Sequence, residues 1–70
     1  MGCKHCVLVR LVGRDLDRLR DVASRLANRS GEDWCTEARP DGTAFCFDNA
    51  HVRTCFKAHC VKYGIPCQML

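Results

Sequence analysis

The chain has 70 residues, seven of them cysteine, and a formal net charge of +3. This length predicts a single domain over residues 1–70, close to the lower size limit for a core without disulfides, a metal or a partner chain. The cysteine count is odd, no signal peptide is visible and no apolar run could cross a bilayer. We therefore expect an intracellular, cytoplasmic protein with reduced thiols and no membrane contact.

Alternating aliphatic residues predict a first strand over residues 6–12, ended by Gly13. A helix should follow from Asp15, which can cap its first turn, to about Asn28, with Gly31 beyond its end. Apolar residues recur at every second position in the strand and at every third or fourth position in the helix, and these residues should be buried. They are Val7, Val9, Leu11, Leu16, Leu19, Val22, Ala23 and Leu26.

Residues 39–42, Arg-Pro-Asp-Gly, are typical of a type I turn and predict a hairpin. A four-residue loop places Trp34 opposite Phe47 and Cys35 opposite Cys46. A three-residue loop with a bulge would shift the register by one and break both pairings. We prefer the four-residue loop because it gathers the aromatic side chains on one face. Whether Cys35 and Cys46 form a disulfide stays open.

A second helix should begin at Asp48 or Asn49 and end before Gly64. The segment after it, residues 65–70, can form a short last strand. The stripe that this helix should turn toward the core contains two cysteines and a histidine. Its members are Val52, Cys55, Phe56, His59, Cys60 and Tyr63.

The predicted order is strand, helix, strand, strand, helix, strand. In a chain of this length, that order favours an α+β fold of the ferredoxin-like, split β-α-β type. Two helices would pack on one face of a four-stranded antiparallel sheet. The other face of the sheet would stay open.

A C-x-x-C pair near the N-terminus can present two thiolates to one tetrahedral Zn²⁺. Since no second such pair follows, the other ligands must come from the start of the second helix and from the last strand, which we expect at the same end of the fold. The alternative is that these cysteines are small hydrophobic core residues. The predicted zinc ligands are Cys3, Cys6, Cys55 and Cys67, with His51 and His59 as alternates.

Residues 42–47, Gly-Thr-Ala-Phe-Cys-Phe, resemble the third-strand motif of RNA recognition domains, in which aromatic side chains on the open sheet face stack on bases. This resemblance implies RNA binding through Phe45, with Arg10 beside it. Burial tendencies instead favour Phe45 and Phe47 as core residues that pack with Trp34. Nucleic acid is therefore not the favoured partner.

We predict that the protein is not an enzyme, because no acid or amide is placed to orient a Cys/His pair and no glycine-rich phosphate loop occurs. The favoured function is a regulator, inhibitor or adaptor that binds another protein, or a homodimer formed through the sheet. Apolar residues with an Arg/Lys rim are typical of protein contacts. The predicted contact residues are Leu8 and Arg10 on the open sheet face, and Arg53, Lys57, Val61 and Lys62 on the second helix.

Overall fold

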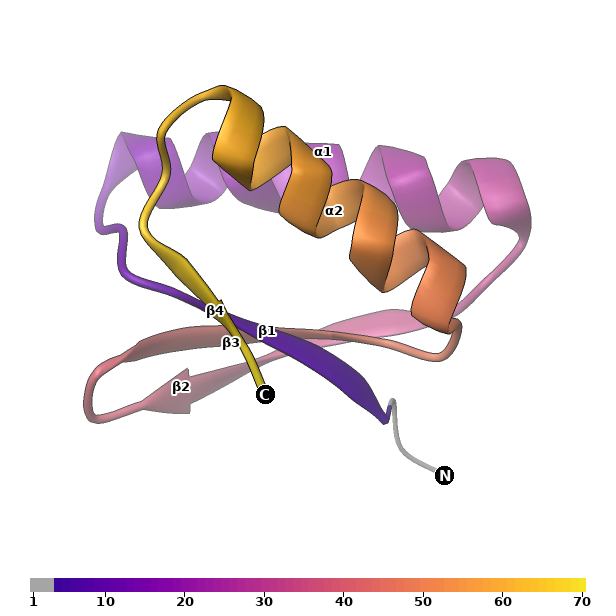
Figure 1. Cartoon of the computed structure of the whole chain (residues 1–70), viewed down its shortest axis with the longest axis horizontal. Helices are drawn as coiled ribbons and strands as arrows, with labels where there is room; N and C mark the ends of the chain where they lie inside the picture. The colour runs from indigo at the N-terminus through magenta and orange to yellow at the C-terminus, as the bar shows by residue number, and fades with distance from the viewer. Residues whose placement is uncertain (1–3) are drawn as a thin grey trace.

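The computed structural model describes residues 4–70 and has the predicted element order. The sheet runs β2-β3-β1-β4, all neighbouring strands are antiparallel, and both helices cover the same face (Figure 1). This is the ferredoxin-like α+β arrangement, so the predicted fold class is confirmed. The elements are β1 (His5–Val9), α1 (Arg14–Ser30), β2 (Trp34–Arg39), β3 (Gly42–Phe47), α2 (Ala50–Lys62) and β4 (Cys67–Met69).

The hairpin between β2 and β3 has the register predicted from its turn residues. Trp34 pairs with Phe47 and Cys35 pairs with Cys46, and the ladder continues to Arg39 and Gly42. Glycine is required at the last of these positions, because a Cβ atom on Gly42 would lie 2.5 Å from the carbonyl oxygen of Val9 in β1. The turn therefore packs directly against the neighbouring strand.

The helix ends differ in part from the prediction. α1 begins one residue before Asp15, and Gly13, at φ 66°, is its N-cap without a side-chain hydrogen bond. Asp15 lies in the first turn instead, where a carboxylate interacts favourably with the helix dipole. The other ends follow the prediction. Gly31 is left-handed at the end of α1, and Asn49 caps α2 by accepting a 2.6 Å hydrogen bond from the His51 amide.

β1 is shorter than predicted, ending at Val9 rather than at Val12. The Arg10 amide still donates to the Pro66 carbonyl, at 3.1 Å, but the chain then leaves the sheet. Val12 is 83% exposed and precedes the positive-φ Gly13. The aliphatic alternation therefore predicted a strand end three residues too late, because no partner strand continues beside residues 10–12.

Three phenylalanines form the centre of the core between the sheet and the helices. Phe45 and Phe47 of β3 and Phe56 of α2 are fully buried, and the Phe56 ring lies 4.9 and 5.1 Å from the other two ring centroids. Trp34 stacks on Phe45 from the edge of the sheet. The core interpretation of these aromatic residues is confirmed. Tyr63, predicted on the buried stripe, is instead 62% exposed because α2 ends at Lys62.

Replacement of the central ring tests this packing. We expect Phe56→Ala to lower the free energy of unfolding by about 3–5 kcal/mol, because it removes a buried ring and leaves a cavity between Phe45 and Phe47. Urea unfolding followed by Trp34 fluorescence measures the change. Val12→Ala, at an exposed position, is the control and should shift stability by less than about 0.5 kcal/mol. Equal effects of the two substitutions would contradict the assigned core.

Candidate functional site

Three cysteines lie in a row across the open face of the sheet. Cys46 of the central strand β3 pairs with Cys6 of β1 on one side and with Cys35 of β2 on the other. We call Cys35, Cys46 and Cys6 the cysteine row. Only Cys46 is buried, at 3% exposure, whereas Cys6 is half-buried and Cys35 is exposed.

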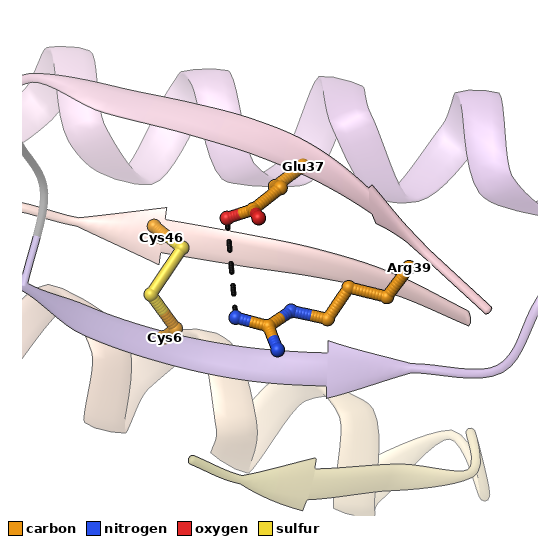
Figure 2. The surroundings of a disulfide bond; sticks show 4 residues. All are labelled: Cys6, Glu37, Arg39 and Cys46. Atoms are coloured by element: carbon orange, nitrogen blue, oxygen red, sulfur yellow. Dashed lines mark ion pairs between the residues drawn. A yellow bond between two sulfur atoms is a disulfide. The ribbon is translucent and has the colours of Figure 1, made fainter. Parts of the chain in front are cut away.

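Cys6 and Cys46 are joined by a disulfide whose Cα atoms lie 4.0 Å apart (Figure 2). The expectation of reduced thiols is therefore wrong for these two residues. The hairpin pattern pointed only to Cys35 as a partner of Cys46, but Cys35 has a free thiol. The predicted fold makes β1 and β3 neighbours, so Cys6 was a second candidate; its register opposite Cys46 is seen only in the structure.

An ion pair lies beside this disulfide. Glu37 and Arg39 extend from β2 across the open face, with 3.9 Å between Oε2 and Nη2 (Figure 2). On the same face, Ala44 pairs with both Glu37 and Leu8; Ala44 is fully buried and Leu8 is 3% exposed. Of the two contact residues predicted on this face, Leu8 is therefore largely covered, whereas Arg10 is exposed.

The predicted zinc ligands are not brought together in the part of the chain that the structure describes. Cys3 lies outside the described residues, and Cys6 is bonded to Cys46. Cys55 lies on α2, with its Sγ 3.8 Å from Nε2 of His51. Cys67 lies at the start of β4, beside Val9 rather than at the end of the strand. Within residues 4–70, no three metal-binding side chains cluster, and zinc binding stays a prediction.

Cys60 and Cys67 form a second pair of neighbouring cysteines, on the helix side of the sheet. Burial raises the pKa of the Cys60 thiol to about 12, and the adjacent Cys67 thiol adds to the increase. Cys60 is fully buried in the core, whereas Cys67 is half-buried at its edge. A thiol that keeps its proton in this way is a poor nucleophile and a poor metal ligand, so Cys60 acts as a core residue.

The exposed side of α2 carries the other predicted contact residues. Val61 is 64% exposed, and Lys57 and Lys62 flank it. These residues, with Thr54 and Ala58, line a shallow hollow of about 420 Å³. Arg53 lies one turn before Lys57 and is half-buried. This helix surface and the open sheet face lie on opposite layers (Figure 1), so the predicted contact residues form two surfaces rather than one.

A second hollow of about 480 Å³ lies between the two helices. Nothing in the sequence indicated it, because it forms between residues that are far apart in the chain. Tyr63 stands at its edge, with its ring centroid 4.6 Å from that of His59 and 5.5 Å from the Lys62 ammonium. The remaining lining residues are Leu11, Asp15, Arg18, Leu19, Val22, Gly64, Ile65 and Pro66.

Comparison with known proteins yields no relative. No protein family, no curated protein and no solved structure matches this chain significantly. Among residues 4–70, no helix has the length and apolar character needed to span a bilayer. The function must therefore be inferred from the chemistry of these surfaces.

Reduction of the disulfide should destabilise the protein. The bond joins residues 40 positions apart, and cross-linking a loop of that length stabilises a fold by about 4 kcal/mol in the chain-entropy description. Urea unfolding with and without a phosphine reductant measures this difference. The matched control is Cys46→Ser, which removes the central sulfur and leaves Cys6 and Cys35 on strands that are not neighbours, so its stability should not respond to the reductant. Equal unfolding midpoints for oxidised and reduced wild type would contradict the bond's assigned role.

The buried Cys60 thiol predicts a loss of stability in alkali. The pKa of this thiol is about 12 in the folded protein, whereas the pKa of an unperturbed thiol is 9.0. Its contribution is therefore complete below about pH 9 and is lost between about pH 9 and 12, by up to ~1.4 kcal/mol per pH unit. Urea unfolding from pH 8 to 11 should show a steeper loss for wild type than for Cys60→Ala. Parallel curves would contradict the burial of a protonated thiol.

Proposed function

We propose that this protein is a non-enzymatic binding module that holds an acidic segment of another protein on the exposed side of α2. One observation carries the proposal: Val61, 64% exposed, lies between Lys57 and Lys62 over a hollow of about 420 Å³. An apolar centre with a positively charged rim is the arrangement found in protein contact surfaces.

The charge of this surface defines the chemistry of the partner. Residues 49–70 contain Arg53, Lys57 and Lys62 and no aspartate or glutamate. Within residues 4–70, neither lysine takes part in an ion pair. Both ammonium groups are therefore available to carboxylates of a partner, which favours association with an acidic segment.

Tyr63 lies just beyond the end of α2, at the edge of the hollow between the two helices rather than in the α2 hollow. Its ring is 62% exposed, yet it is held between the His59 ring and the Lys62 ammonium. Tyrosine provides a large contact area with little rotamer entropy to lose, and it is common among the residues that dominate binding energy. A partner that continues past the end of α2 would add Tyr63 as a second contact, separate from the hollow at Val61.

A protein partner is favoured over RNA because, among residues 4–70, the open sheet face has no aromatic platform. Phe45 and Phe47, the candidate stacking residues, are both fully buried on the helix side. Arg10 is exposed, but one cation without stacking rings provides only a phosphate contact. RNA binding is therefore an outcome to be tested rather than the proposal.

Titration with model ligands tests the assignment. We expect an acidic amphipathic peptide of leucine and glutamate to shift the ¹⁵N-amide resonances of Thr54, Ala58 and Val61. A lysine–leucine peptide and single-stranded RNA should leave these resonances unchanged. The double variant Lys57→Glu/Lys62→Glu should weaken acidic-peptide binding by roughly tenfold or more, because like charges would then face each other.

The control is Arg25→Glu/Arg29→Glu, which makes the same change in net charge at exposed positions of α1. It should preserve most of the affinity. Equal weakening by both double variants would show that total charge, and not the α2 surface, determines binding. Self-association through the sheet would appear as a concentration-dependent mass in sedimentation experiments and as shifts in β2 rather than α2.

A further inference from the structure

The cysteine row has a geometry that allows one disulfide to exchange for another. In antiparallel sheets, neighbouring pairs alternate between a hydrogen-bonded type and a closer type without mutual hydrogen bonds. The Asp48 amide donates to the Asp33 carbonyl at 3.1 Å. Asp33 and Asp48 face each other one step beyond the Trp34–Phe47 pair, so this bond makes them a hydrogen-bonded pair. Pairs of this type recur at every second residue, and Cys35 and Cys46 therefore form one as well. Their Cα atoms are therefore about 5.5 Å apart, within the range that a disulfide spans.

The other side of the row belongs to the closer type. The Leu70 amide donates to the Cys6 carbonyl at 3.1 Å, so the Cys6 backbone groups point toward β4 and away from β3. Cys6 and Cys46 thus form a non-hydrogen-bonded pair, in agreement with their bonded state. Cys46 can accordingly bond to either neighbour without any change in strand register.

We propose that the cysteine row is a thiol–disulfide exchange site for low-molecular-weight disulfides such as oxidised glutathione. Cys35 is its entry residue because it is the exposed member of the row. Cys46, at 3% exposure, is the central sulfur that passes the bond to Cys6. This activity is independent of the protein contact proposed for α2, which lies on the opposite layer (Figure 1).

The reaction proceeds in three balanced exchanges. In the reduced row, the Cys35 thiolate attacks oxidised glutathione, and one glutathione leaves with a mixed disulfide formed at Cys35. The Cys46 thiolate then attacks Cys35 Sγ and releases the second glutathione. Finally the Cys6 thiolate attacks Cys46 Sγ, and Cys35 leaves and is protonated. Two protein thiols are oxidised to the Cys6–Cys46 disulfide, and one glutathione disulfide is reduced to two thiols that take up their protons.

The arrangement of the strands suits the last exchange. Thiol–disulfide exchange needs the entering, central and leaving sulfurs close to a line, and the row runs across three adjacent strands with Cys46 in the middle. The Glu37 carboxylate lies on the same face as Cys35, but its pairing with Arg39 offsets the negative charge beside the row (Figure 2). The three other described cysteines do not take part, because Cys55, Cys60 and Cys67 belong to α2 and β4.

Time-resolved disulfide mapping of the reduced full chain tests this proposal. Trypsin does not cleave before Pro40, so combined digestion with trypsin and a glutamate-specific protease places the three cysteines on separate peptides, 5–10, 33–37 and 38–53. After addition of oxidised glutathione and acid quenching, we expect glutathione on 33–37 first. The 33–37/38–53 link should follow, and the 5–10/38–53 link should appear last.

Two variants separate the steps. Cys6→Ser should accumulate the 33–37/38–53 link, since the final exchange is blocked. Cys35→Ser, an exposed change that leaves the fold intact, should form the 5–10/38–53 link several-fold more slowly than wild type. Cys55→Ser is the matched control and should behave as wild type. The proposal is overturned if Cys35→Ser oxidises at the wild-type rate, or if folded Cys6→Ser keeps glutathione on 33–37 without forming the link.

Discussion

The register of β3 against its two neighbours is the constraint on which both faces of the sheet depend. Successive residues of a strand point to opposite faces, so Phe45 and Phe47 enter the core while Ala44 and Cys46 lie on the open face. A slip of one residue would exchange these sets and would place two aromatic rings in solvent. The burial of the phenylalanines therefore also determines where Cys46 lies, and with it the position of the cysteine row.

The features that depend on local chemistry were predictable from the sequence. The Arg-Pro-Asp-Gly turn determined the hairpin register, and Asn49 and Gly31 marked helix ends correctly because caps act within one turn. The disulfide was missed because it joins strands that are separated by α1 and the hairpin, and hydrophobic alternation does not give their relative register. The burial of Leu8 was missed for a related reason, since alternation along one strand does not show what covers that face of the sheet.

The candidate surfaces also divide into a part that local sequence predicts and a part that it does not. Lys57, Val61 and Lys62 were predicted as an exposed group because helix periodicity places them together on one side of α2. The hollow beside Tyr63 was not predicted, since it arises from the way two helices and the segment after α2 diverge. The two layers thus present different chemistry: cations and apolar side chains on α2, and sulfur on the sheet.

Gly42 limits how the hairpin can vary. Any side chain at this position would meet the backbone of β1, 2.5 Å from the Val9 carbonyl oxygen, and backbone cannot rotate away as a flexible side chain can. Pro40 and Asp41, at the tip of the turn, are exposed. Insertions or peptide tags are therefore best tolerated between Pro40 and Asp41, whereas a change at Gly42 would force apart the strands that hold the cysteine row.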